Sequence, residues 1–158
     1  MSLSVNETSP EPARLKDLEA LMALEESCFA PERRESRGSV RRSLLSPCQE
    51  VWVLRRGDRL TAAMTLRIFR KTLRLYSLAV SAEFRGRGLG EQLVRHAALR
   101  AGDLHISRLT LEVDAGDERL QGLYLRLGYH CHQSLPDYYG PGLAAYRYIQ
   151  ILSPPPTP

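Results

Sequence analysis

Residues 73–102 read LRLYSLAV-SAEFRGRGLG-EQLVRHAALRAG, and this stretch decides the fold of the chain. Its first part has the apolar, β-compatible residues of a buried strand. Its last part has apolar residues at helical spacing, namely Leu89, Leu93, Val94, Ala97, Ala98 and Ala101. Gly102 suits a left-handed residue at the end of that helix. The order of strand, glycine turn and helix directs the first N–H groups of the helix beyond the end of the strand.

The glycine turn, residues 85–90, has the properties of a phosphate or pyrophosphate site. The first N–H groups of a helix have no intrahelical partner and carry partial positive charge. Glycine lets the backbone approach a bulky anion, and Arg85 and Arg87 add positive charge. A dinucleotide fingerprint would need a glycine where Glu91 stands, and no Walker G-K-[ST] ending is present. For this motif alone, an ordinary glycine turn before a surface helix stays the alternative.

Two motifs together resemble a known family. Arg85, Gly88 and Gly90 form R-x-x-G-x-G directly after an L-A-V strand end, which resembles the GNAT superfamily of acetyl-CoA-dependent N-acetyltransferases. Residues 111–113 (LEV) and 123–129 (LYLRLGY) resemble the L-E-V and L-Y-x-x-x-G-[FY] signatures of the same superfamily. The resemblance covers nearly the whole chain, and its nearest subgroup acetylates the N-terminal alanine of a ribosomal protein.

The resemblance implies that acetyl-CoA is the acyl donor and that the glycine turn holds its pyrophosphate. The cofactor-binding residues that it implies are Leu78, Ala79, Val80, Arg85, Gly86, Arg87, Gly88, Leu89, Gly90 and Asp117. The acyl group would lie between two parallel strands that splay apart, the strands ending at Val80 and Val113. An acyl-CoA-binding module without turnover and an enzyme with another acyl donor are the alternatives.

The other residues fit one α/β (α+β) domain over 1–152, followed by a flexible Pro-rich tail over 153–158. The expected fold is a mixed, mostly antiparallel sheet of six to seven strands flanked by four helices, with parallel central strands. The expected helices are 14–27, one capped by Ser36 and ending near Pro47, 89–102, and one capped by Asp117 and ended by Gly128. The expected strands are a short one at 3–5, then 50–56, 60–69, 73–80, 108–113, 129–135 and 143–151.

Glu112 and Tyr124 are the candidate catalytic residues. Acyl transfer to an amine needs a group that accepts the amine proton, a donor for the carbonyl oxygen and a proton for the leaving thiolate. Glu112 at a strand end is suited to be the base, and the resemblance gives Tyr124, twelve residues later, the role of acid. It also gives the Val80 N–H the role of oxygen donor. The alternatives are a structural Glu112 paired with an arginine and a Tyr124 packed in the core.

The sequence departs from the ribosomal subgroup at several positions. Asp114 and Asp117 stand where the pattern L-E-V-R-x-x-N has Arg and Asn. An aspartate cannot donate as an amide does, so the pantetheine contact that the resemblance gives to the Asn lacks its donor at Asp117. The only tryptophan, Trp52, lies on an expected strand, and residues 143–145 read LAA where an acidic element is usual.

Asp114, Tyr138 and Tyr139 are the candidate acceptor-binding residues. Asp114 lies two residues beyond Glu112, so the two carboxylates share one side of the strand. Such a pair would attract a cation and raise each other's pKa. The loop carrying Tyr138 and Tyr139 offers apolar walls and hydrogen-bonding tips. The expected acceptor is a primary, cationic amine, with a protein N-terminus slightly ahead of a small polyamine.

The composition restricts the partners. The net charge of +4 is spread along the chain rather than gathered with exposed aromatic residues, so no nucleic-acid partner is expected. Residues 1–7 lack the features of a signal peptide, and no apolar run reaches about 20 residues. Three cysteines without paired spacing indicate free thiols, so a cytoplasmic monomer or homodimer without a membrane partner is expected. The triplet at 130–132 (HCH) lacks further ligands at suitable spacing, so no metal is expected, and Cys131 has no identifiable base beside it.

Overall fold

The computed structural model describes residues 9–153. In chain order the elements are β1 (Glu11–Pro12), η1 (Leu15–Asp17), α1 (Leu18–Cys28), η2 (Pro31–Arg33), α2 (Arg37–Leu45), β2 (Gln49–Arg56), β3 (Arg59–Ile68), β4 (Thr72–Val80), η3 (Ala82–Phe84), α3 (Leu89–Asp103), β5 (Arg108–Asp114), α4 (Glu118–Arg126), β6 (His130–Leu135) and β7 (Ala145–Ile151). The predicted strand at 3–5 and all of the predicted tail except Ser153 lie outside the described residues.

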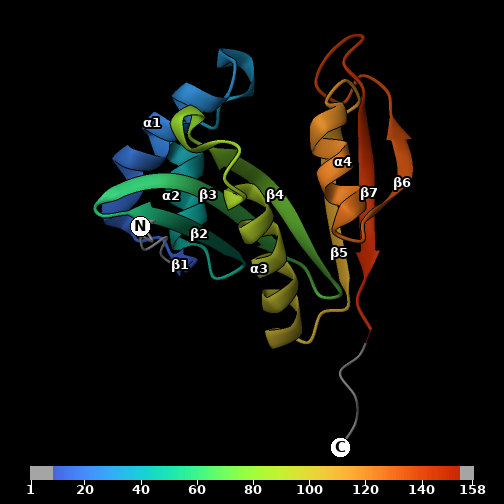
Figure 1. The fold of residues 1–158 in the computed structure, drawn as a ribbon, viewed down its shortest axis with the longest axis horizontal. Helices are drawn as coiled ribbons and strands as arrows, with labels where there is room; N and C mark the ends of the chain where they lie inside the picture. The colour runs from blue at the N-terminus through green and yellow to red at the C-terminus, as the bar shows by residue number, and fades with distance from the viewer. Residues whose placement is uncertain (1–8, 154–158) are drawn as a thin grey trace, which may run out of the picture.

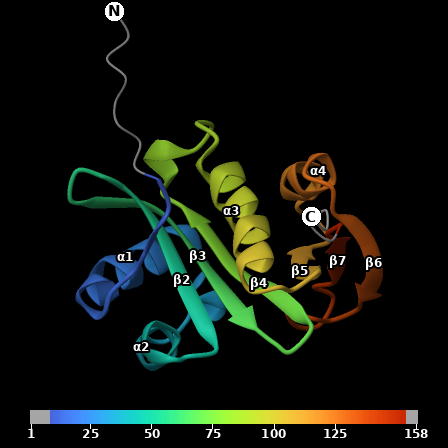
Figure 2. The same ribbon diagram turned by 90° about the horizontal axis from the view of Figure 1, so that it is seen from below.

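The strands form one sheet of seven in the order β1-β2-β3-β4-β5-β7-β6. Only β4 and β5 pair in parallel, and all other neighbours are antiparallel. In Figure 1 the sheet separates into two wings at β4 and β5, and Figure 2 shows α1 and α2 on one face with α3 and α4 on the other. This arrangement confirms the predicted mixed, mostly antiparallel sheet with four flanking helices. No helix within residues 9–153 is long and apolar enough to cross a bilayer.

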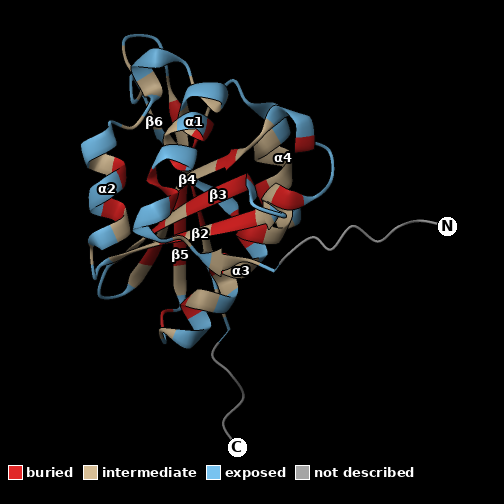
Figure 3. Ribbon diagram, turned by 90° about the vertical axis from the view of Figure 1, so that its left-hand side faces the viewer, coloured by how far each residue is buried: buried red, intermediate tan, exposed pale blue. Residues whose placement is uncertain are grey.

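Buried apolar residues form two clusters, one on each face of the sheet, and buried residues are red on the ribbon of Figure 3. On the α3 side, the buried face of the helix carries five of the residues predicted from helical spacing: Leu89, Leu93, Val94, Ala97 and Ala101. The sixth, Ala98, is partly buried against the same core. On the other side, α1 buries Leu18, Leu21 and Leu24 against β2, β3 and β4. The two cores hold both ends of β4 in place, and the site described below lies at its C-terminal end.

The ends of the helices agree with the sequence at Ser36, Asp117 and Gly128 and differ at Gly102. Ser36 caps α2 by accepting a hydrogen bond from the Ser39 N–H at 3.1 Å. Asp117 caps α4 through the Leu120 N–H at 3.0 Å, and Gly128 follows that helix at φ +96°. Gly102, however, stays inside α3, and the left-handed residue is His105 at φ +57°. The Ile106 N–H closes this turn by donating to the Ala101 carbonyl at 2.8 Å. The prediction of a glycine end at Gly102 was therefore wrong.

The two parallel strands separate soon after they meet. The β4–β5 pairing runs only from Thr72↔Arg108 to Leu75↔Leu111, although β4 continues to Val80 and β5 to Asp114. Tyr76 is a bulge in β4, because Thr65 pairs with Ser77 and Leu66 with Leu75. A bulge bends its strand and interrupts the ladder. The splayed central strands predicted from the family resemblance are confirmed, and Glu112 is the first residue of β5 beyond the pairing.

Candidate active site

The glycine turn forms a concave row of free backbone donors. Gly86 and Gly88 both have left-handed backbone conformations, with φ +77° and +79°. Gly88 caps α3 without any side-chain hydrogen bond. Within residues 9–153, the backbone N–H groups from 86 to 91 have no hydrogen-bond partner. An anion placed here would meet several unused donors at the positive end of the helix.

The backbone of this turn is open at two of its glycines. A Cβ atom on Gly86 or Gly88 would meet nothing within 4 Å, so the backbone there is open to a ligand. At Gly90 a Cβ would lie 3.7 Å from Val80 Cγ2, which shows that α3 begins against the end of β4. The Arg87 guanidinium lies 5.2 Å from the centre of the Phe84 ring. The turn therefore packs directly against the end of β4, which carries Leu78 and Ala79.

The backbone of Val80 is oriented toward the opening between the strands. The Ser81 N–H donates to the Thr61 carbonyl at 2.9 Å, while Ala62 lies opposite Val80. Residue pairs in an antiparallel ladder alternate between bonded and non-bonded. The Val80 N–H therefore points away from β3, to the side on which β5 has separated. The Val80 carbonyl accepts hydrogen bonds from Arg85 Nε at 3.1 Å and from Cys28 Sγ at 3.4 Å.

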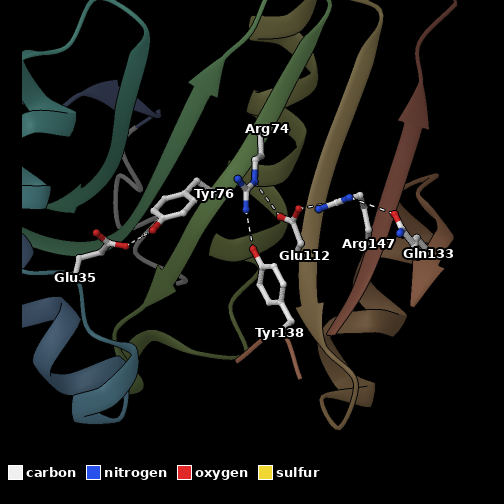
Figure 4. A network of polar contacts seen from close by, with 7 residues as sticks. All are labelled: Glu35, Arg74, Tyr76, Glu112, Gln133, Tyr138 and Arg147. Carbon is white, nitrogen blue, oxygen red and sulfur yellow. Dashed lines mark hydrogen bonds and ion pairs between the residues drawn. The ribbon is translucent and has the colours of Figure 1, made fainter. Parts of the chain in front are cut away.

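Glu112 lies in a row of polar side chains that crosses four strands (Figure 4). Arg74 Nε of β4 donates to one Glu112 oxygen and Arg147 Nε of β7 to the other, both at 3.0 Å. Arg147 also donates to Gln133 of β6 at 3.3 Å. The Glu112 side chain is only 6% exposed. The pairing with arginine that the sequence left as an alternative is present, and each oxygen keeps one further acceptor position.

Asp114 has partners within the protein on both oxygens. Arg33 of η2 donates to it at 2.8 Å, and the Gly116 N–H donates to it at 2.8 Å. The Gly116 hydrogen bond, followed by the Arg33 hydrogen bond, lowers the pKa of Asp114. The expectation that Glu112 would raise the pKa of Asp114 is therefore wrong. Asp114 accepts hydrogen bonds from a guanidinium and from a backbone N–H, and both stabilise its ionised form.

The loop between β6 and β7 covers this row. The Tyr138 hydroxyl accepts a hydrogen bond from Arg74 Nη2 at 2.8 Å. The Arg33 guanidinium stacks on the Tyr139 ring at 4.1 Å from its centre. Burial, followed by Tyr138, raises the pKa of Tyr139 to about 12, with Asp114 and Glu112 adding to the effect and Arg33 opposing it. The structure thus brings the predicted acceptor residues close to Glu112.

Tyr124 lies on the buried face of α4. Its ring packs edge-on against Tyr129 at 5.7 Å and Tyr148 at 6.4 Å. Its hydroxyl has no hydrogen-bond partner among the described residues, and burial raises its pKa, with Tyr129 and Tyr139 adding to the effect. The hydroxyl therefore stays protonated near neutral pH. The role of Tyr124 stays a prediction, as does cofactor binding by Asp117, whose carboxylate caps α4.

Sequence reasoning missed the basic side chains of the site: Arg33, Arg74 and Arg147. Each belongs to a different segment, and only strand register brings them to the two carboxylates. Glu112 lies directly opposite Arg147 in the β5–β7 pairing. Side-chain alternation alone does not show which residue of β7 lies opposite Glu112. Among residues 9–153, no group of three or more metal-ligating side chains is present.

Comparison with known proteins identifies a family and similar folds. The profile of the acetyltransferase (GNAT) family matches residues 18–129. A Bacillus subtilis (strain 168) protein assigned as a ribosomal protein bS18-alanine N-acetyltransferase is 28% identical over 116 residues, or 73% of this chain and 76% of that protein. The blasticidin-S acetyltransferase of Streptomyces morookaense is 35% identical over 75 residues, or 48% of this chain and 54% of that protein. The ribosomal-protein-S18-alanine N-acetyltransferase structure from Escherichia coli superposes with a TM-score of 0.86 at 19% identity, covering 94% of this chain and 96% of that one.

Proposed function

The chain belongs to the acetyltransferase (GNAT) family, whose members use acetyl-CoA, and from this premise we propose that it acetylates the N-terminal amine of a protein or peptide. One observation carries the proposal. The β4–β5 pairing ends at Leu111, immediately before Glu112, on the side to which the Val80 N–H points. The likeness to a ribosomal-protein N-acetyltransferase over 73% of the chain supports this acceptor class.

Residues around the gap between β4 and β5 have separate roles in the proposed reaction. Acetyl-CoA, when bound, supplies a thioester that the amine attacks. The turn at 85–90 holds the pyrophosphate, and the Val80 N–H donates to the carbonyl oxygen on which negative charge develops. Glu112 accepts the amine proton as the N–C bond forms. Tyr124 donates its proton to the sulfur as the C–S bond breaks.

The acceptor site lies on the face of the sheet that carries Glu112. Tyr138 and Tyr139 border it from the β6–β7 loop, and Asp114 holds Arg33 against Tyr139. A substrate backbone would lie along these aromatic rings with its amine directed at Glu112. Asp117 supports the pantetheine side by fixing the start of α4.

A small-molecule amine is the second candidate acceptor, and the relative named as a blasticidin-S acetyltransferase supports it. Mass spectrometry after incubation with acetyl-CoA and a mixed panel of peptides, lysines, polyamines and aminoglycosides separates the candidates. We expect acetylation at peptide N-termini. If only small amines are modified, the acceptor is a small molecule and not a peptide N-terminus. If acetyl-CoA binds but no acetylated product forms, the protein is an acyl-CoA-binding module without turnover.

We also propose a reducing, cytoplasmic location, with a monomer or homodimer as the working form. Cys28, Cys48 and Cys131 are all free thiols in the structure, which supports a compartment where disulfides do not persist. Size-exclusion chromatography with light scattering distinguishes the two forms. A larger assembly would contradict the proposal.

Gly88→Val is expected to lower the affinity for acetyl-CoA by about tenfold or more. The side chain would fill the open space over the donors, and a β-branched residue is strained at φ +79°. Calorimetric titration with acetyl-CoA measures the effect. Arg87→Ala should weaken binding less. The Arg87 side chain is exposed, and the backbone N–H groups of the turn remain in this variant.

Gly57→Val is the matched control for Gly88→Val. Gly57 has φ +60° in the β2–β3 hairpin, so the variant carries the same kind of strain outside the anion turn. We expect a similar loss of thermal stability with unchanged acetyl-CoA affinity. Equal affinity losses in the two variants would show that strain, rather than a blocked pyrophosphate site, explains the effect of Gly88→Val.

A further inference from the structure

The guanidinium groups beside Glu112 are only partly used by the protein. Arg74 and Arg147 are 23% and 33% exposed, against 6% for the carboxylate between them. A guanidinium carries five N–H donors. Arg74 uses two of its groups, on Glu112 and Tyr138, and Arg147 uses two, on Glu112 and Gln133. Both arginines therefore keep free donors at the mouth of the acceptor site.

The position of these donors is set by the sheet. Arg147 lies directly opposite both Glu112 on β5 and Gln133 on β6. Along the described part of β6 the side chains are exposed except for the half-buried Leu135. In Figure 4 the row Arg74, Glu112, Arg147 and Gln133 runs across the sheet beside Tyr138. A group bound next to Glu112 would meet Arg147 on the side away from β4.

The site has more positive than negative charge. Around the acceptor position lie the guanidinium groups of Arg33, Arg74 and Arg147 and the carboxylates of Glu112 and Asp114. The neighbouring group around Tyr76, where Arg67 stacks on the ring and Glu35 accepts from the hydroxyl, also holds Glu25, so the positive excess is confined to the row at Glu112. A purely cationic acceptor would leave one guanidinium without a counter-charge, at a partly buried site where screening is reduced.

We infer that the acceptor carries an anionic group close to its amine, and that Arg147, assisted by Arg74, binds this group. The inference rests on the proposed function and defines its substrate class. A guanidinium fork matches a carboxylate in two-point geometry. The anion has two sources, an acidic residue that follows the N-terminal residue of a peptide or the α-carboxylate of a free amino acid. Arg147 is thus a specificity residue, while Glu112 takes the amine proton.

The test compares acceptors that differ only in charge. Three peptides with Glu, Gln or Lys at the second position, and alanine against alaninamide, are measured for kcat/KM with wild-type protein. We expect a preference of about tenfold or more for Glu over Lys, and the pair that shows the preference identifies the source of the anion. Arg147→Gln should bring the ratio close to one. Arg41→Gln, an exposed change of equal charge on α2, should leave the ratio unaltered.

A binding measurement separates failure of this inference from failure of the proposed function. Calorimetric titration of the three peptides without acetyl-CoA should show the same order, Glu above Gln above Lys, whether or not turnover occurs. Acetylation without any charge preference would overturn the inference and leave the proposed function standing. Equal binding of the three peptides together with equal binding of alanine and alaninamide, or a preference that persists in Arg147→Gln, would also overturn it.

Discussion

Glu112→Gln is expected to lower kcat/KM for a peptide amine by about 10²-fold at pH 7, and the loss should shrink as the pH rises. A positioned general base contributes about 10²–10⁴-fold. Without it, only acceptor that is already deprotonated reacts, so the variant follows the free-amine fraction while the wild type does not. Rates at intervals from pH 6.5 to about pH 10.5, with acetyl-CoA saturating, measure the ratio between the two proteins.

The size of the pH effect identifies the amine. An α-amino group has a pKa of about 7.7–8.0, so roughly one molecule in seven is free at pH 7. For an N-terminal acceptor the loss should therefore shrink by about sevenfold by pH 9 and then level off. For a lysine-like amine, with a pKa of about 10.4, it would keep shrinking beyond pH 9. The part of the loss that remains at high pH measures proton transfer during the attack itself.

Asp114→Asn is the matched control for this variant. Asp114 lies on the same strand, two residues on, and also forms an ion pair with an arginine. Removing its charge should reduce stability and acceptor affinity without changing the pH dependence. If Glu112→Gln and Asp114→Asn both keep a wild-type pH profile, Glu112 is an anchor for Arg74 and Arg147 and not the base.

Local patterns predicted much of the fold. The apolar spacing on α3, the cap at Asp117 and the end at Gly128 each depend on neighbouring residues, and the structure bears out all three. The glycine turn was also recognisable, because the glycines at 86 and 88 and the following helix are consecutive. The end of α3 was not recognisable. The chain turns there through a hydrogen bond from the Ile106 N–H to the Ala101 carbonyl, which lies five residues back rather than four as in the helix.

The environment of Glu112 could not be predicted in the same way. Its partners come from β4 and β7, and their positions depend on the bulge at Tyr76 and on the register with Ala145–Ile151. Side-chain alternation predicts which face a residue occupies but not which residue on another strand lies opposite. The sequence therefore suggested an acidic site open to cations, whereas arginines hold both carboxylates. This difference changes the expected charge of the acceptor.

The second large effect is expected at Tyr124. Tyr124→Phe should lower kcat by about 10²-fold near pH 7, with little change in acetyl-CoA affinity. The substitution removes one hydroxyl and keeps the buried ring that packs on Tyr129 and Tyr148. A thiol has a pKa of about 8.5, so its thiolate is already a moderate leaving group, and the effect should lie at the low end of the range for general acids. Above about pH 8.5 the loss should diminish, because protonation of the thiolate is no longer favoured.

Tyr129→Phe separates this role from packing. The Tyr129 hydroxyl is buried without a hydrogen-bond partner among the described residues, and its ring lies 5.7 Å from that of Tyr124. Removing an unsatisfied buried hydroxyl is neutral or slightly stabilising, so Tyr129→Phe should keep wild-type kcat. Pre-steady-state measurement of free thiol should show slower thiol release in Tyr124→Phe alone. Equal rates in the two variants would show that the Tyr124 hydroxyl does not donate the proton and that the buried ring only supports β5 and β7 from α4.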